Sequence, residues 1–337
     1  RIRHRARRRV EIRRALAAGA STPFFLLQPG LLAEGLQHLE ALDFGRPVRH
    51  WYSCKTQPAP PLLRWWRAQG RPIEVVSEFE FRAALAEGFA PDQILVNGPA
   101  KHHWLPKVAM PGIRVHFDSL AEAKTLARLA RKLHWRIGLR FHPTTEIDPE
   151  NPERPTQFGH TAPEFRATLN HLKKQGIHPD ALSFHLRTNI PDPSHYQVAI
   201  QESAALCQEL GFHPRYLDCG GGLPPPWILM KRGKRYDAHM DAAALAEMYR
   251  RAWKLIPSVE ELWLENGRHL LARTGVLVVR ILDIKERDGC RQLICNGGRT
   301  MNALISTWEH HALHPLENRR GLTVPPAVHG PTCMAFD

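Results

Sequence analysis

Two residues whose side chains could take part in catalysis lie at the ends of strand-like runs in this chain. Lys55 comes directly after the run 48–54, and Glu265 ends the run 261–265. A lysine amine at the mouth of a buried strand is costly to keep charged, and its neutral form can condense with a carbonyl group to form a Schiff base. A buried carboxylate can keep the ring nitrogen of an electron-sink cofactor protonated. The alternative interpretation of Glu265 is an acid at the start of the next helix.

A third candidate element is a glycine-rich turn. The strand-like run 215–219 leads into three consecutive glycines, Gly220, Gly221 and Gly222. Because they lack Cβ atoms, their backbone N–H groups can approach phosphate oxygens closely. Arg268 could add a bidentate phosphate contact. The alternative interpretation of the glycines is an ordinary loop. His185 can likewise be either a packed core histidine or a ring stacked on a cofactor.

The elements that must position these residues alternate between strands and helices. The strand-like runs are 48–54, 72–76, 93–97, 113–117, 136–142, 181–186, 215–219 and 261–265. Ser77, Ser119 and Thr161 each precede a glutamate by three residues, the spacing of a capping box at a helix start. Strand–helix alternation favours parallel strands with helical crossovers.

Eight such units predict a (β/α)8 TIM barrel of the α/β class. A doubly wound open sheet is the alternative, but no Gly-x-Gly-x-x-Gly follows the first strand. Active sites of TIM barrels lie at the carboxyl ends of the strands. The residues at those ends include Lys55, Arg140, His185, the triple glycine and Glu265, so we expect them to converge.

The pattern changes after Gly275 to strands without comparable helices, at 276–284 and 292–295. This change predicts a second, all-β domain that the early strand 23–27 joins. The predicted domains are a barrel over residues 30–272 and a partial β-sandwich over residues 1–29 and 273–337.

The composition argues against binding of nucleic acid, a cysteine-based metal site and insertion into a membrane. The chain has 337 residues and a net charge of +13, much of it in the run 1–9. We interpret that run as a solvated or frayed terminus and expect no nucleic-acid partner, since no nucleic-acid module follows it. Six cysteines without Cys-x-x-Cys spacing argue against a metal site and for a reduced, cytoplasmic protein. No apolar run is long enough to span a membrane.

Nine short motifs occur in order through nearly the whole chain. They are Tyr52-Ser53-Cys54-Lys55, Ser77-Glu78-Phe79-Glu80, Asn97-Gly98-Pro99-Ala100-Lys101, Phe117-Asp118-Ser119, Gln157-Phe158-Gly159, Ser183-Phe184-His185, Asp218-Cys219-Gly220-Gly221-Gly222, Glu265-Asn266-Gly267-Arg268 and His329-Gly330-Pro331-Thr332-Cys333. With these motifs the chain resembles the fold-type III pyridoxal-phosphate decarboxylases, the family of the diaminopimelate, ornithine and arginine decarboxylases.

The resemblance implies a role for each candidate residue. Lys55 is expected to hold pyridoxal 5'-phosphate as a Schiff base, His185 to stack on the pyridine ring, and Glu265 to pair with the ring nitrogen. Thr188, the triple glycine and Arg268 are expected to hold the phosphate. The full set of expected cofactor-binding residues is Lys55, Glu74, Arg140, His185, Thr188, Gly220, Gly221, Gly222, Glu265, Gly267 and Arg268.

The resemblance also implies a partner. Cys333 matches the cysteine that reaches the neighbouring subunit's site and donates a proton after carbon dioxide leaves. We therefore expect a homodimer with shared active sites and a small amino-acid substrate. Because the family continues with further β-strands, including a glycine-alanine-tyrosine segment, we also expect that the chain is truncated after Asp337.

The chain departs from the family pattern at several positions. Arg187 occupies the place of a small residue in the usual His-x-Gly-Ser, and Gln157 that of a lysine. Met334 follows Cys333, where an acidic residue is common, and Ser306-Thr307 replace the arginine-proline pair that reads the distal end of diaminopimelate. Without those charges the remote groups of diaminopimelate would stay unpaired, which argues against that substrate.

Three functions therefore stay open at the level of sequence. The first is decarboxylation of a basic or otherwise polar amino acid. The second is racemisation with the same cofactor, which needs acid/base groups on opposite faces. The third is a catalytically inactive regulatory homologue.

Overall fold

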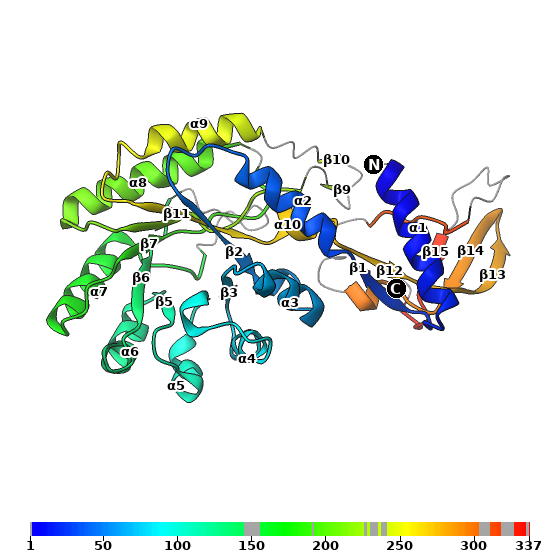
Figure 1. The fold of residues 1–337 in the computed structure, drawn as a ribbon, viewed down its shortest axis with the longest axis horizontal. Helices are drawn as coiled ribbons and strands as arrows, with labels where there is room; N and C mark the ends of the chain where they lie inside the picture. Colours follow the sequence, from blue (N-terminus) through cyan, green and yellow to red (C-terminus); the bar gives the residue numbers. More distant parts are fainter. Residues whose placement is uncertain are drawn as a thin grey trace. The chain divides into compact units, whose positions relative to one another are not determined.

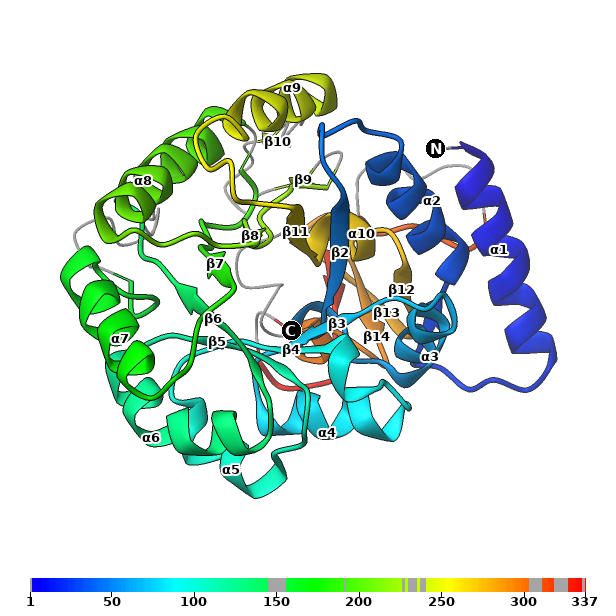
Figure 2. The same cartoon turned by 60° about the vertical axis from the view of Figure 1, so that its left-hand side comes forward.

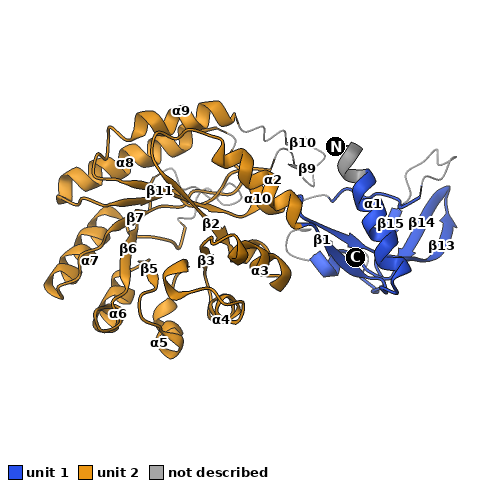
Figure 3. Ribbon diagram, in the orientation of Figure 1, with its two compact units in different colours: residues 1–28, 227–237, 273–337 blue, residues 29–226, 238–272 orange. Residues whose placement is uncertain are grey.

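A computed structural model describes residues 2–144, 156–190, 192–225, 228–229, 235–236, 241–302, 311–317, 327–334 and 337. The chain divides into two compact units, shown in different colours in Figure 3. Unit 1 contains residues 1–28, 227–237 and 273–337, and unit 2 contains residues 29–226 and 238–272. Among the described residues, no helix has the length and apolar character that crossing a membrane requires.

Unit 2 is a closed barrel of eight parallel strands in the order β11-β2-β3-β4-β5-β6-β7-β8. The strands are β2 (Val48–Ser53), β3 (Ile73–Val75), β4 (Ile94–Val96), β5 (Arg114–Phe117), β6 (Arg136–Arg140), β7 (Ala181–Ser183), β8 (Tyr216–Asp218) and β11 (Glu261–Asn266). The predicted TIM barrel is confirmed. The doubly wound alternative is excluded because β11 pairs with both β2 and β8 and so closes the sheet.

Helices lie outside this ring of strands, as Figures 1 and 2 show. They are α2 (Pro29–Glu40), α3 (Pro60–Ala68), α4 (Glu78–Ala86), α5 (Leu105–Val108), α6 (Leu120–Lys132), α7 (Ala162–Lys174), α8 (Ser194–Leu210), α9 (Ala242–Ala252) and α10 (Arg268–Leu271). Short 3-10 turns lie between strands and helices: η1 (Cys54–Thr56), η2 (Pro91–Gln93) and η3 (Lys101–His103).

Large side chains fill the centre of the barrel. Trp51, Leu95, Ala181, Tyr216 and Trp263 form one buried cluster contributed by five strands. The Trp51 and Trp263 ring centroids are 5.1 Å apart, and Tyr216 stacks on Trp263 at 4.7 Å. Layered packing of this kind closes a TIM barrel to solvent and leaves the chemistry to the strand ends.

The predicted capping box is present at α7, where the Thr161 N–H donates to Glu164 Oε2 (2.9 Å), but the boxes predicted at α4 and α6 are incomplete. Ser77 and Ser119 accept hydrogen bonds from the backbone N–H groups of Glu80 (3.3 Å) and Glu122 (3.2 Å), as expected. The two glutamates, however, accept from the residue before each serine, namely Val76 and Asp118. Each carboxylate thus ties its helix to the end of the preceding strand instead of closing the predicted reciprocal pair.

Unit 1 contains a helix as well as strands. Its elements are α1 (Ile2–Ala17), β1 (Phe24–Leu27), β9 (Ile228–Leu229), β10 (Arg235–Tyr236), β12 (Gly275–Val278), β13 (Ile281–Arg287), β14 (Cys290–Cys295), η4 (Arg299–Asn302) and β15 (Ala327–His329). β1 pairs with β12, and β13, β14 and β15 form a second sheet. The separate β-sheet region is confirmed, but its all-β character was wrong.

Two details of unit 1 correct the sequence analysis. The basic run that we expected to be solvated or frayed is the start of α1, because residues 2–17 hold no glycine or proline and are rich in good helix formers such as alanine and arginine. Only the frayed alternative was therefore wrong. The single strand predicted at 276–284 is two strands, which end and restart around Val279 and Arg280 because β12 pairs with β1 while β13 pairs with β14.

One buried ion pair connects the barrel to α6. Lys101 Nζ donates to Glu122 Oε2 (2.6 Å) and to the Gly98 carbonyl (2.6 Å), and both charged side chains are fully buried. Glu122 also accepts from the backbone N–H groups of Lys101 (3.1 Å) and Asp118 (2.9 Å). This one carboxylate therefore fixes the loops after β4 and β5.

We predict that Lys101→Met lowers the free energy of unfolding by about 3–5 kcal/mol, because it leaves the buried Glu122 carboxylate without its cation. Urea denaturation measures the loss. The control is Arg82→Ala, which breaks the exposed pair between Arg82 and Glu78 (2.8 Å) and should cost only about 0.5 kcal/mol. Equal losses in the two variants would show that the buried pair does not stabilise this region.

Candidate active site

Lys55 lies at the mouth of the barrel, in the η1 turn directly after β2. Its Nζ atom is 3.9 Å from Glu74 Oε1, and Glu74 is fully buried. Ser53 and Glu74 face each other in the parallel register of β2 and β3, and Ser53 Oγ donates to Glu74 Oε2 (2.8 Å). The strand pairing thus places a fixed carboxylate beside the lysine.

The charge of Lys55 differs from the expectation of an easily neutralised amine. Burial lowers its pKa, but the carboxylates of Glu74 and Glu265 outweigh burial, so that the pKa of Lys55 is raised. The expectation of a lowered pKa was wrong because it considered only the strand that carries Lys55. Glu74 and Glu265, which belong to neighbouring strands, raise the pKa. The Lys55 side chain still keeps 46% of its surface exposed, so the amine is accessible.

Asn97 joins the two carboxylates that surround Lys55. Its Nδ2 atom donates to Glu265 Oε1 and, more weakly, to Glu74 Oε1 (3.4 Å). All three side chains are buried: Glu74 lies in β3, Asn97 directly follows β4, and Glu265 lies in β11. One amide group therefore holds two like charges close together, which is unfavourable unless a proton or a cation compensates them.

Part of that compensation is a proton. Burial, together with the charge of Glu74, raises the pKa of Glu265 to about 7, although Lys55 and Arg140 act in the opposite direction. Asp218 is hydrogen-bonded to Glu265, and burial and the Glu265 charge raise its pKa well above the ordinary value. Near neutral pH, the Glu265–Asp218 pair therefore retains a proton.

His185 lies against the glycine turn. The Gly221 N–H donates to His185 Nδ1 (3.1 Å), so this nitrogen acts as an acceptor and the ring is neutral. Burial, and then the positive charges of Lys55 and Arg140, lower the pKa of His185 well below its ordinary value. His185 Nδ1 is also 4.0 Å from Glu265 Oε2, which places the ring between the turn and the acid pair.

The glycine turn has no room for side chains. A Cβ atom on Gly220 would lie 2.4 Å from His185 Nδ1, and one on Gly221 would lie 2.5 Å from the Glu265 carbonyl oxygen. Gly222 has a φ of +96°, and its Cβ would lie 2.7 Å from the Arg187 carbonyl oxygen. Each glycine is therefore required by close approach, and Gly220 and Gly222 also by their positive φ.

Hydrogen bonds within the protein already use part of this turn. The Gly220 N–H donates to Asp218 Oδ1 (2.9 Å), and the Tyr196 hydroxyl donates to the Gly221 carbonyl (2.7 Å). The Gly221 N–H donates to His185. The turn therefore offers fewer N–H groups to an anion than the three that we predicted. The phosphate role of the turn stays a prediction.

Other predicted site residues occupy the surrounding loops. Arg140 Nη1 is 3.7 Å from Asp118 Oδ1, and the guanidinium lies 4.6 Å from the centroid of the Phe158 ring. Gly267 is packed so closely that its Cβ would lie 2.1 Å from Thr56 Oγ1, and Arg268 begins α10. Burial lowers the pKa of Arg268.

Thr188 and Cys333 are exposed, like Lys55. Thr188 lies in the segment after β7, and Cys333 lies after β15 in unit 1. The structure thus brings together Lys55, Glu74, His185, the glycine turn and Glu265, with Arg140 close enough to influence their charges. The roles of Thr188 and Cys333 stay predictions. Ser306-Thr307, whose identity argues against diaminopimelate, lie outside the described residues.

Sequence reasoning gives no role to Asn97 or Asp218, although both lie inside motifs of the resemblance. His116 also lies here, buried with its Nδ1 atom 3.7 Å from Asp218 Oδ2. Ligand atoms of His116, Asp218 and Glu265 lie within 4.8 Å of one another. The available signal is position, because His116 lies in β5, Asp218 ends β8 and Glu265 lies in β11, all of them strands of the closed barrel.

Known proteins resemble this chain over most of its length. Residues 35–272 match the family model described as pyridoxal-dependent decarboxylase, pyridoxal binding domain. The diaminopimelate decarboxylase of Archaeoglobus fulgidus is 26% identical over 331 residues, which cover 94% of this chain and 77% of that protein.

Solved structures show the same fold. The diaminopimelate decarboxylase of Helicobacter pylori complexed with L-lysine superposes with a TM-score of 0.77 at 21% identity, covering 96% of this chain and 82% of that one. The arginine decarboxylase of Paramecium bursaria Chlorella virus bound to agmatine superposes with a TM-score of 0.74 at 20% identity, covering 97% and 87%. With the family model matching most of the chain, this protein belongs to the pyridoxal-dependent decarboxylases.

Proposed function

We propose that this pyridoxal-dependent amino-acid decarboxylase uses Lys55 as the covalent attachment point of its cofactor and Cys333 of a partner subunit as its proton donor. The observation that carries the proposal is the position of the Lys55 amine. It is accessible at the mouth of the barrel, 3.9 Å from the buried Glu74, and its pKa depends on Glu265 beside the glycine turn.

The residues at the barrel mouth fit pyridoxal phosphate. When bound, the cofactor supplies a conjugated ring that stabilises the negative charge left when a carboxylate departs as carbon dioxide. Glu265 would bind the ring nitrogen, since its raised pKa lets it share a proton at neutral pH. His185 would lie on the ring face, where its neutral imidazole adds no competing charge.

The phosphate would be bound on the glycine side of the site. Gly222 is the member of the turn best suited to offer its N–H, because those of Gly220 and Gly221 donate to Asp218 and His185. Arg268 and Thr188 would supply the charge and the hydroxyl. Arg140 would add positive charge near the cofactor, as it does toward Glu265 now.

The substrate we propose is a basic or otherwise polar amino acid. Named relatives act on such compounds: the structural neighbours include an arginine decarboxylase bound to agmatine and a diaminopimelate decarboxylase complexed with L-lysine. Met334 follows Cys333 where an acid is common in the family, so this chain offers no carboxylate there to pair with a distal amine. A basic or otherwise polar side chain that lacks the second amino-acid group of diaminopimelate fits that change better than diaminopimelate does.

We predict that protein purified with pyridoxal phosphate has a visible absorbance that disappears in Lys55→Ala, because the absorbing group forms with the Lys55 amine. Spectrophotometry after dialysis measures it. Lys124→Ala, which removes an exposed lysine on α6, is the control and should keep the absorbance. An unchanged spectrum in Lys55→Ala would refute the assignment.

The raised pKa of Glu265 has a consequence for stability. A carboxyl group whose pKa is higher in the folded state than in the unfolded state favours folding at low pH. That contribution is lost as pH rises from the ordinary value of 4.5 to about 7. We predict that cofactor-free Glu265→Gln loses less stability between pH 5 and pH 8 than the unsubstituted protein does, measured by urea denaturation at both pH values.

The control for this pH effect is Glu260→Gln. Hydrogen bonding to Arg215 lowers the pKa of the exposed Glu260, so this group titrates below pH 5. The difference in stability between pH 5 and pH 8 should therefore be unchanged in Glu260→Gln. The same pH dependence in Glu265→Gln and in the unsubstituted protein would contradict the raised pKa.

The reaction itself is tested with a panel of amino acids. We predict release of carbon dioxide from at least one basic or polar amino acid, without racemisation of the remaining substrate. Carbon dioxide capture and polarimetry on the same samples separate the two activities. Loss of optical activity without carbon dioxide release would favour a racemase.

A further inference from the structure

Asp337 lies at the junction of two loops in unit 1. Its Oδ1 atom accepts from the Thr300 N–H (2.9 Å), and its Oδ2 atom accepts from the Thr332 hydroxyl (2.6 Å) and, at 3.3 Å, the Thr332 N–H. Asp337 is only 8% exposed. Hydrogen bonds from Thr332 and Thr300 hold its pKa below the ordinary value, so it is ionised at neutral pH.

Two glycines make this arrangement possible. A Cβ atom on Gly298 would lie 2.5 Å from Asp337 Oδ1, and one on Gly330 would lie 2.5 Å from Oδ2. Neither glycine has a positive φ, so the space taken by the carboxylate, and not backbone conformation, excludes a side chain. Gly330 directly follows β15, and Gly298 lies in the loop after β14, so the carboxylate packs against the segments that leave both strands.

The backbone of Asp337 also forms hydrogen bonds to the segment 330–334. The Gly330 N–H donates to the Asp337 carbonyl (3.0 Å), and the Asp337 N–H donates to the Met334 carbonyl (3.0 Å). The segment 330–334 is thus bonded to Asp337 at both ends. Cys333 lies inside it, between Thr332 and Met334.

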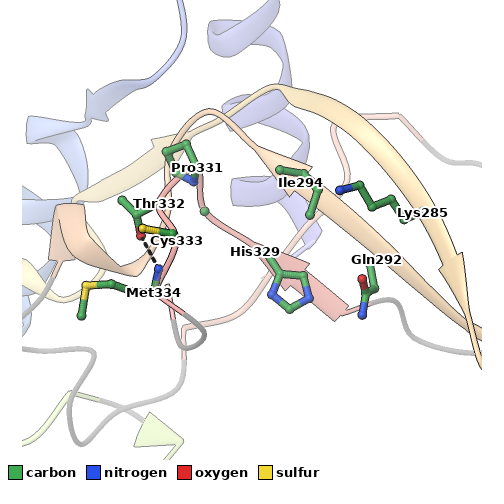
Figure 4. A pocket seen from close by; sticks show the side chains of 9 residues that line it. Lys285, Gln292, Ile294, His329, Pro331, Thr332, Cys333 and Met334 are labelled. Atoms are coloured by element: carbon green, nitrogen blue, oxygen red, sulfur yellow. Dashed lines mark hydrogen bonds between the residues drawn. The ribbon is translucent and has the colours of Figure 1, made fainter.

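Figure 4 shows the immediate surroundings of Cys333. Thr332 Oγ1 accepts from the Met334 N–H at 3.4 Å, the dashed line in the figure, so one hydroxyl connects Asp337 to both neighbours of the cysteine. Cys333 lines a cavity of about 330 Å³ together with His329 and Lys285. The thiol is exposed and has no contact with Asp337 in the interactions described above.

We infer that Asp337 is a positioning residue for Cys333: its carboxylate holds the segment 330–334 in the one conformation that presents the thiol for proton donation. This inference rests on the proposed function of Cys333. Asp337 does not touch the reacting atoms and so acts only through the cysteine.

The test is a double-mutant cycle on the full-length holoenzyme with Asp337→Asn and Cys333→Ala. An asparagine turns an NH₂ group toward donors that need an acceptor, so the segment loses part of its anchoring. We expect Asp337→Asn to lower kcat by about 10-fold or more, the scale of a misplaced catalytic group, with KM nearly unchanged. In the Cys333→Ala background, the same substitution should have no further effect.

The outcomes distinguish a failure of the proposed role of Cys333 from a failure of the positioning role of Asp337. If Cys333→Ala leaves kcat unchanged, the proposed role of the cysteine fails, and the positioning role fails with it. If Cys333→Ala lowers kcat but Asp337→Asn does not, only the positioning role is overturned. Equal losses from Asp337→Asn in both backgrounds would also overturn it, because Asp337 would then act elsewhere.

Two further measurements guard against a variant that merely misfolds. Iodoacetamide should label Cys333 several-fold faster in Asp337→Asn, relative to Cys290 as an internal reference, and an unchanged ratio would contradict the inference. Thr332→Val should lower kcat in the same direction, whereas Thr332→Ser, which keeps the hydroxyl, should restore it. Asp288→Asn, in the exposed turn between β13 and β14, is the matched control and should change neither kcat nor labelling.

Discussion

The site depends on two buried carboxylates being held close together around one amine. Glu74 and Glu265 come from strands on either side of β2, and Asn97 donates to both. Two carboxylates bridged by one amide group repel strongly in the buried, weakly polar interior. Holding Glu74 and Glu265 together therefore requires a cation and a proton. Lys55 supplies the cation, and the Glu265–Asp218 pair retains the proton. A cofactor ring nitrogen that shares this proton would relieve the same electrostatic cost.

Close packing makes this concentration of charge possible. Glycines stand where a side chain would collide with a functional group, as at Gly220 against His185 and Gly267 against Thr56. Gly138 does the same for His116, since a Cβ atom there would lie 2.3 Å from the imidazole. In each case a functional side chain packs directly against the glycine backbone in the space that a Cβ atom would otherwise fill. The glycines therefore let these side chains approach the barrel strands closely.

Much of the fold could be predicted from local sequence. Each barrel strand is a short apolar run between a helix end and a helix start, so its position follows from periodicity and capping residues, as for residues 73–75 before Ser77. Predictions failed where a contact with a residue from another element determined the local structure. The strand at 276–284 divides because β12 and β13 pair with different strands, and Glu80 reaches Val76 because the strand end lies within reach.

The candidate site was predictable in its members but not in its charges. Lys55 and Glu265 could be found from their positions at strand ends, yet the pKa of Lys55 depends on Glu74 and Glu265, which approach it only in the closed barrel. Asn97 was missed for the same reason, because an amide carries no chemical signal until its two partners are known. Residue type and position therefore indicate where chemistry occurs, and tertiary contacts set the protonation states.

The most direct measurement of the central claim is to locate the covalently bound cofactor. The protein is incubated with pyridoxal phosphate, reduced with borohydride so that the bond becomes permanent, digested, and examined by mass spectrometry. The account predicts a single stoichiometric modification on the peptide that contains Lys55. Modification of another lysine, such as the buried Lys101, or none at all under these conditions, would contradict it.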